Sequence, residues 1–141
     1  MKFCKCGKLI EYTQRLCSDC EVKQTARNKI KNKEYKNARQ DEDIQSIYNS
    51  KKWKITVRII SNRDNGLCIL CLSEGRLRYK DTVHHIVEVK EDISKAYVLL
   101  NLICLCESCH QKVHREYKIN KLTKENMQNK LIKLIKDTQG V

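Results

Sequence analysis

One stretch of sequence decides the fold, residues 83–114, which reads VHHIVEVKEDISKAYVLLNLICLCESCHQKVH. The β-branched residues among positions 83–89 favour a strand, and the apolar run 99–105 favours a second one. The polar segment 88–95 is expected to form the loop between them. From Ser108 onward, His110, Val113, His114 and Tyr117 recur at helical spacing. The stretch therefore predicts two strands followed by a helix.

All four histidines of the chain lie in this stretch. His84 and His85 are neighbours on the first expected strand, so their side chains point to opposite faces. His110 and His114 are one helical turn apart and share a helix face. One strand histidine and both helix histidines are expected to form a three-histidine metal site with positions open for water and phosphate. The alternative, purely structural histidines, explains their concentration poorly.

Two CxxC pairs frame this stretch, and in a reducing compartment such pairs indicate zinc rather than disulfides. We expect one structural zinc that clamps the ends of the hairpin through four thiolates, those of Cys68, Cys71, Cys106 and Cys109. Cys104 lies in the second apolar run and is expected to be a buried small hydrophobe rather than a ligand.

The amino-terminal twenty residues contain four more paired cysteines, Cys4, Cys6, Cys17 and Cys20. Their spacing predicts a second structural zinc, with Gly7 easing the tight knuckle. Unliganded cysteines in a loose tail are the alternative. The role of such a site stays open between a DNA-contacting ribbon and a unit that only stabilises the fold.

The charge of the chain points to an anionic partner. Its 29 Lys and Arg against 17 Asp and Glu give a formal charge of +12. Two four-thiolate zinc sites, each contributing −2, would lower this to about +8. Nucleic acid is the expected partner, although a basic surface can also serve solubility alone. With neither a secretory signal nor an apolar run near 20 residues, we expect no membrane association and a cytoplasmic location.

Four segments are expected along the chain: a zinc knuckle at 1–22, a basic helical arm or linker at 23–47, a central domain at 48–117, and an amphipathic helix at 118–141. The arm carries Lys23, Arg27, Lys29, Lys31, Lys33, Lys36 and Arg39. It can serve as a solvated linking helix, as a helix that tracks phosphates, or as both.

Two further helices are predicted around the central stretch. One spans 48–66, with Ser50 as its cap, Asn65-Gly66 as its stop, and Trp53 on its apolar face as a core residue. The other spans 122–137, with Thr123 as its cap and an apolar face formed by Met127, Leu131, Leu134 and Ile135.

The central motif resembles the HNH endonuclease family, the ββα-metal nucleases. The resemblance rests on His84-His85, Asn101-Leu102 and Cys106-x-x-Cys109-His110-x-x-x-His114, and the surrounding sequence is similar to small HNH proteins of bacteriophages and prophages. It covers residues 48–117 firmly and 1–20 loosely. It implies an α+β fold: a small zinc-stapled ββα-metal domain with flanking helices and an N-terminal zinc ribbon.

The resemblance also implies roles for the site residues. His84, His110 and His114 would bind the catalytic metal, which could be Mg²⁺, Mn²⁺, Ni²⁺ or Zn²⁺, and His114 is the less constant ligand among relatives. His85 would be the general base that activates water. Asn101 would hydrogen-bond across the hairpin and hold the loop near His85 in position.

The expected activity is therefore that of a metal-dependent hydrolase, an endonuclease that nicks DNA and leaves 5′-phosphate and 3′-hydroxyl ends, with a role in phage DNA processing or packaging. Two alternatives stay open: a zinc-dependent DNA-binding protein without catalysis, and a nonspecific nuclease that acts on RNA. A homodimer and phage packaging proteins are the further partners to consider.

Overall fold

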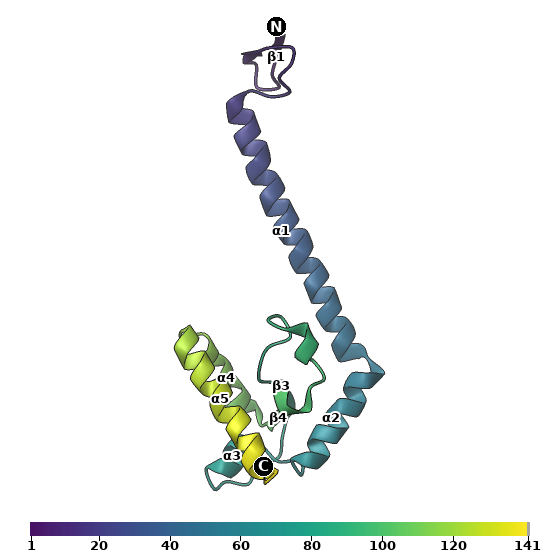
Figure 1. Ribbon diagram of the computed structural model, residues 1–141, viewed down its shortest axis with the longest axis vertical. Helices are drawn as coiled ribbons and strands as arrows, with labels where there is room; N and C mark the ends of the chain where they lie inside the picture. The colour runs from purple at the N-terminus through teal and green to yellow at the C-terminus, as the bar shows by residue number, and fades with distance from the viewer. Residues whose placement is uncertain (141) are drawn as a thin grey trace. The chain divides into compact units, whose positions relative to one another are not determined.

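Residues 1–140 are described by the computed structural model, and they group into two units, Met1–Asp43 and Ile44–Val141. The elements of the second unit are drawn in teal to yellow in Figure 1. Each unit is considered by itself, and the helix α1 (Ser18–Asn49) contributes residues to both. No helix within the described residues is long and apolar enough to span a membrane.

The first unit consists of a small hairpin followed by the basic helix. Strands β1 (Lys2–Phe3) and β2 (Leu9–Ile10) pair antiparallel, and Gly7 takes a positive φ of 89° in the connecting turn. Helix α1 begins at Ser18, inside the Cys17-x-x-Cys20 pair. The expected boundary between positions 22 and 23 therefore lies inside a continuous helix. Beyond the knuckle the helix is exposed on nearly all sides, as its charged sequence requires.

Helix α2 (Lys51–Arg63) has the predicted cap and stop, within narrower bounds than 48–66. The Ser50 side chain accepts a hydrogen bond from the amide of Trp53 at 3.1 Å, which satisfies one free amide of the first turn. Asn65 and Gly66 both take left-handed backbone conformations and end the helix, as predicted.

The central hairpin pairs β3 (Thr82–His85) with β4 (Leu102–Leu105), and His84 lies opposite Ile103 while His85 lies opposite Leu102. The prediction that the second strand starts at position 99 was wrong. Residues Leu99–Asn101 form a 3₁₀ turn (η2) instead, and Leu99 and Leu100 are partly exposed. The Ile86 amide still donates to the Asn101 carbonyl at 2.8 Å, and the Asn101 side chain bonds the backbone of Val87, the next residue along. A second 3₁₀ turn, η1 (Ile93–Lys95), lies within the loop between the strands.

The two faces of the hairpin pack against different helices, as Figure 1 shows with β3 and β4 between α2 and the α4–α5 pair. Leu102 and Cys104 pack with Ile60 of α2. Ile103 and Leu105 belong instead to the larger core formed with α3 (Ile69–Ser73), α4 (Glu107–Tyr117) and α5 (Lys121–Thr138). Because successive strand residues face opposite sides, this division also separates His84 from His85.

Helix α5 covers the larger core with Met127, Leu131 and Ile135, all buried as predicted, while Leu134 is partly buried against it. The prediction of Thr123 as its cap was wrong. Asn120 is the cap, because its side-chain oxygen accepts a hydrogen bond from the Thr123 amide at 2.8 Å. Thr123 therefore supplies the amide, three residues along, that a capping side chain normally satisfies.

Candidate metal and active site

Three histidines meet where strand β3 passes helix α4. The ligand nitrogens of His84, His110 and His114 all lie within 4.8 Å of one another. The Nε2 atoms of His110 and His114 are 2.9 Å apart. Two nitrogens about 2.1 Å from one octahedral ion would be separated by about 3 Å, so the spacing of the helix pair suits a shared metal. The structure thus brings together the three histidines predicted as ligands.

Burial keeps two of these histidines, His84 and His110, in the state that binds cations. His84 is 3% exposed, and burial, with the neighbouring His114 and His110, lowers the pKa of His84 to about 3. Burial also lowers the pKa of His110. Neutral imidazoles with free lone pairs are the form that coordinates metals. The donor set therefore fits a divalent ion.

His85 lies on the opposite face of the strand, next to α2. Its Nε2 is 2.9 Å from the carbonyl oxygen of Ala96, and because a carbonyl only accepts, Nε2 carries the proton. The lone pair of the ring is therefore on Nδ1. The indole of Trp53 stacks on the imidazole with ring centroids 4.9 Å apart and planes 17° apart. Burial lowers the pKa of His85, so the ring is neutral at pH 7 and its Nδ1 can accept a proton.

Asn101 fixes the loop that carries the Ala96 carbonyl. Its Oδ1 accepts from the amide of Val87 at 2.8 Å, and its Nδ2 donates to the carbonyls of Val87 and Lys95 at 3.1 and 3.2 Å. The amide is 5% exposed, and all of its bonds run to backbone atoms. Asn101 thus connects the residues just after His85 to the residue just before Ala96.

The sequence assigned no role in the site to three polar side chains that surround the histidines. Tyr48, at the carboxyl end of α1, places its hydroxyl 3.3 Å from His85 Nδ1. Glu88 places a carboxylate oxygen 3.5 Å from His114 Nδ1. The Tyr117 hydroxyl donates to the Ile86 carbonyl at 2.8 Å and lies 3.5 Å from His84 Nε2. Only Tyr117 left a signal in the sequence, because it follows His110 and His114 at helical spacing.

All four histidines line one groove with a volume of about 660 Å³. Tyr48, Trp53 and Val57 contribute aromatic and apolar lining, and the charged lining residues are Lys80, Asp81, Glu88 and Lys90. Trp53 is partly buried and packs against the small core that contains Ile60, Leu102 and Cys104, in line with the prediction of a core residue. Its side chain also lines the groove. The groove thus places the neutral imidazole of His85 beside the three-histidine cluster.

The four cysteines that flank the hairpin are brought together as predicted. Their sulfurs lie within 4.8 Å of one another, with Cys71 Sγ 3.7 Å from Cys106 Sγ and 3.5 Å from Cys109 Sγ. Four sulfurs bonded at about 2.3 Å to one tetrahedral zinc would be about 3.8 Å apart. Burial and the nearby sulfurs raise the pKa of Cys109, because clustered thiolates need a cation to balance them. This donor set fits zinc.

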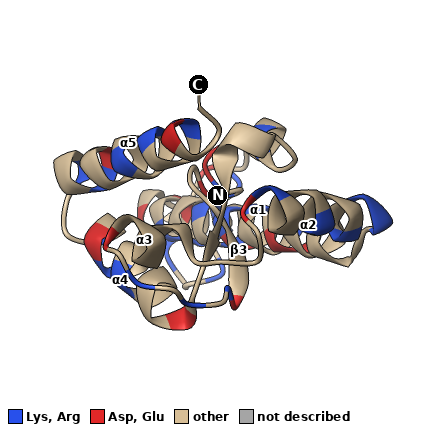
Figure 2. Ribbon diagram, turned by 90° about the horizontal axis from the view of Figure 1, so that it is seen from below, with Lys and Arg blue, Asp and Glu red and all other residues tan. Residues whose placement is uncertain are grey.

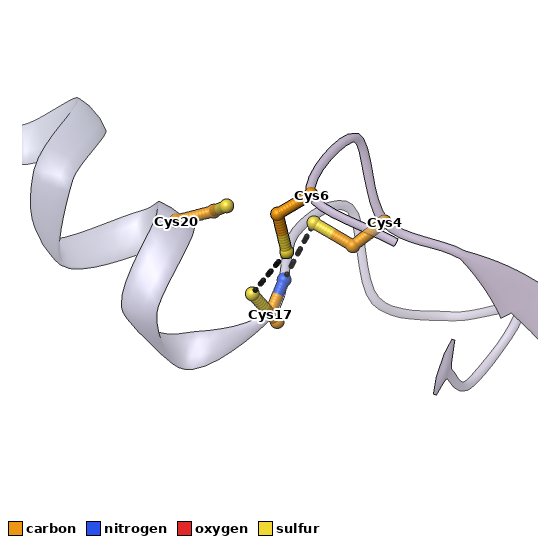
Figure 3. A group of neighbouring side chains, drawn as sticks. All are labelled: Cys4, Cys6, Cys17 and Cys20. Atoms are coloured by element: carbon orange, nitrogen blue, oxygen red, sulfur yellow. Dashed lines mark hydrogen bonds between the residues drawn. The ribbon is translucent and has the colours of Figure 1, made fainter. Parts of the chain in front are cut away.

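The amino-terminal cysteines form a similar cluster, shown in Figure 3. Cys6 Sγ is 3.5 Å from Cys17 Sγ, and Cys4 Sγ accepts from the amide of Cys17 at 3.3 Å. Backbone hydrogen bonds lower the pKa of Cys4 to about 6, whereas hydrogen bonds with the sulfurs of Cys6 and Cys17 raise the pKa of Cys20 to about 12. Without a cation the four groups cannot all ionise, so this set also fits zinc.

Cys104 belongs to neither cluster. It is fully buried between the hairpin and α2, and burial together with Asp64 raises the pKa of its thiol to about 12. The expectation of a buried small hydrophobe is confirmed. Asp64 accepts from the Cys104 amide at 3.1 Å and pairs with Arg63, which also donates to the Leu102 carbonyl at 2.6 Å. This polar link ties the end of α2 to β4.

Comparisons with known proteins agree on one family. A family model described as HNH endonuclease matches residues 68–116. A probable HNH endonuclease of Lactococcus phage SK1 is 37% identical over 78 residues, which are 52% of this chain and 81% of that protein. The crystal structure of the HNH endonuclease of deep-sea thermophilic bacteriophage GVE2, with manganese ion, matches with a TM-score of 0.59 and 32% identity, covering 61% of this chain and 94% of that one. The groove, its histidines and these relatives show that the chain belongs to the HNH endonuclease family and is a nuclease.

Proposed function

We propose that this nuclease is a metal-dependent DNA endonuclease that nicks one strand and leaves 5′-phosphate and 3′-hydroxyl ends. The observation that carries the proposal is the groove in which His85, with a free Nδ1 lone pair, lies beside three clustered histidines. Phosphodiester hydrolysis needs an activated water and charge stabilisation at phosphorus, and these two groups of side chains match those two needs.

His84, His110 and His114 would hold the catalytic metal. When bound, the ion would stabilise the charge at the phosphate and on the departing oxygen. A set of three imidazoles favours Zn²⁺, Ni²⁺ or Mn²⁺ over Mg²⁺ in binding strength. The solved phage relative was crystallised with manganese ion, which makes Mn²⁺ the first metal to test.

His85 acts as the general base in this proposal. Its Nδ1 takes one proton from water, the water oxygen forms a bond to phosphorus, and the bond from phosphorus to the 3′-oxygen breaks. The leaving oxygen takes its proton from solvent. Asn101 is a positioning residue, because it holds the loop whose Ala96 carbonyl fixes the His85 ring. His85 stays neutral before the step because it is buried.

The two cysteine clusters would hold structural zinc, one ion each. In the second unit, the zinc would join α3 to the start of α4, directly before His110. In the first unit, it would close the knuckle at the start of α1. We propose that four segments have separate roles: a knuckle at 1–22, an arm at 23–47, a nuclease domain at 48–117 and a terminal helix at 118–141.

DNA is the proposed substrate because helix α2, whose Trp53 and Val57 line the groove, is strongly basic. Helix α2 carries five basic residues and no acidic one, and its blue segments are visible in Figure 2. The phage origin of both relatives favours DNA processing or packaging in the cytoplasm of a host cell. An RNA substrate and a homodimer remain to be tested. A purely DNA-binding role no longer applies, because the chain belongs to a nuclease family.

The test is a plasmid assay with one divalent metal at a time. Supercoiled plasmid should become open-circular with Mn²⁺ and with at least one of Ni²⁺, Zn²⁺ and Mg²⁺, and EDTA added just before the reaction should stop it. The His85→Ala variant should be slower by about 10² to 10⁴, the usual contribution of a general base. Its metal content should equal that of the wild type, and its melting temperature should fall only by the packing and the hydrogen bond lost with the buried ring. Nicking at a wild-type rate by this variant would show that His85 is not the base.

A further inference from the structure

Tyr48 is brought to the active groove by the break between two helices. Helix α1 ends at Asn49, and the Ser50 hydroxyl donates to the Ile47 carbonyl at 2.6 Å while it caps α2. This sharp junction sets the ring of Tyr48 edge-on against Trp53, with centroids 5.3 Å apart. The last turn of α1 thereby contributes to the nuclease site.

The Tyr48 hydroxyl meets the reactive nitrogen of His85. Because His85 Nε2 donates to the Ala96 carbonyl, Nδ1 is an acceptor, and the hydroxyl 3.3 Å away must be its donor. The stacked Trp53 and the Ala96 carbonyl already fix the plane and the tautomer of the ring. The Tyr48 hydroxyl is therefore not needed to orient the His85 ring. What it adds is a hydrogen-bond donor next to the Nδ1 lone pair.

The geometry of this contact suits a bond that opens to admit water. A normal hydrogen bond of a hydroxyl is about 2.8 Å long, so 3.3 Å indicates a weak bond that water replaces at little cost. Tyr48 is 40% exposed and lines the groove. Burial and the carboxylate of Glu88 raise the pKa of Tyr48, which keeps the hydroxyl protonated as a donor.

We propose that Tyr48 is a further catalytic residue, which shares the nucleophilic water with His85 and aims it at the phosphorus. This inference rests on the proposed function of His85 as general base. The water oxygen accepts a hydrogen bond from the Tyr48 hydroxyl and gives one proton to His85 Nδ1. That oxygen then forms the bond to phosphorus as the bond to the 3′-oxygen breaks. Tyr48 neither gains nor loses a proton in the step.

The test compares Tyr48→Phe with Tyr97→Phe. Tyr97 is a matched control, because its hydroxyl also makes one hydrogen bond nearby, to Ser50 at 3.1 Å, but lies outside the groove lining. Tyr48→Phe keeps the aromatic contacts and should lower kcat by about 10- to 100-fold, the effect of a misaligned nucleophile, with KM within about twofold. Tyr97→Phe should leave both constants within about twofold of the wild type. Melting temperature and Mn²⁺ affinity should not change in either variant.

A second readout needs neither substrate nor catalysis. Nitrogen NMR of the histidine rings should show the Nδ1 resonance of His85 shifted in Tyr48→Phe, because its hydrogen-bond donor is gone, and unchanged in Tyr97→Phe. A kcat of Tyr48→Phe within about twofold of the wild type, or an increase, would overturn the inference. A change confined to KM would also overturn it. If the wild type itself does not nick, or His85→Ala nicks normally, the proposed function fails instead.

Discussion

At the scale of single residues, the two adjacent histidines differ because the strand turns them to opposite faces. His84 meets other histidines and Tyr117, whereas His85 meets two aromatic rings and a backbone carbonyl. The same sequence pair thus supplies one side chain suited to coordination and one suited to proton transfer. The surroundings of each ring, more than its own chemistry, make the difference.

Glu88 offers a test of how the proposed metal ligands are oriented. His114 turns Nε2 toward His110 and Nδ1 toward the Glu88 carboxylate, an arrangement that would form a carboxylate–histidine–metal triad with a bound ion. We predict that Glu88→Ala weakens Mn²⁺ binding by about 10- to 100-fold in calorimetric titrations, with the melting temperature of the metal-free protein unchanged.

Glu91→Ala is the control for this prediction. Glu91 lies on the same loop but pairs with Lys124 instead of a histidine. Its Mn²⁺ affinity should match that of the wild type. Equal affinities in all three proteins would show that the carboxylate of Glu88 does not orient His114.

At the scale of secondary-structure elements, the second unit holds a hairpin of only four residues per strand. Such a short pair gains little stability from its own ladder and depends on what covers it. One face is covered by α2, through apolar contacts and the Arg63–Asp64 link, and the other by α3, α4 and α5. The proposed zinc would add a cross-link between α3 and α4 through its thiolate ligands.

Cys109→Ser should therefore unfold the second unit at a lower temperature. One thiolate of the proposed clamp is lost, and structural zinc contributes folding free energy directly. Elemental analysis should find about two zinc ions in the wild type and about one in this variant. A calorimetric melt should show its transition shifted down, and nicking should decline only as far as folding does.

Cys104→Ala is the matched cysteine control, because Cys104 is buried outside both clusters. It should lose some stability from the small cavity but keep both zinc ions. If Cys104→Ala lost zinc and Cys109→Ser kept it, the assignment of the ligands would be wrong.

At the scale of the whole molecule, charge dominates the expected interaction with DNA. The chain carries 29 basic and 17 acidic side chains, and α1 and α2 hold many of the basic ones in exposed positions. Binding of this kind releases counterions from the phosphates and is therefore sensitive to salt.

We predict a steep, linear fall of log affinity with log salt concentration, by about 0.9 for each phosphate contacted. Fluorescence anisotropy of a labelled duplex, titrated with the His85→Ala variant so that the DNA stays intact, measures the slope. DNA sequences of different composition should give similar slopes and affinities. An affinity independent of salt would contradict an electrostatic mode of binding.

Much of the site could be predicted because its information is local. Ligand spacing along the chain reveals which cysteines and histidines form pairs, and strand alternation separates His84 from His85 without any knowledge of packing. The capping residue of α5 and the start of β4 are harder to predict from the sequence. The cap depends on one hydrogen bond, from the Thr123 amide to Asn120, for which neighbouring side chains compete, and the start of β4 depends on a short 3₁₀ turn at Leu99–Asn101 within an apolar run.

The amino-acid sequence by itself determined the two-strand-and-helix motif, the three groups of candidate ligand residues and the basic charge, because each follows from periodicity, spacing or composition. Only the tertiary structure decided what surrounds the histidines. Tyr48 and Ala96 reach His85 from 37 and 11 residues away, and Glu88 reaches His114 from a loop 26 residues earlier. No periodic pattern connects such distant positions, since their approach is set by how α2, the hairpin and α4 pack against one another.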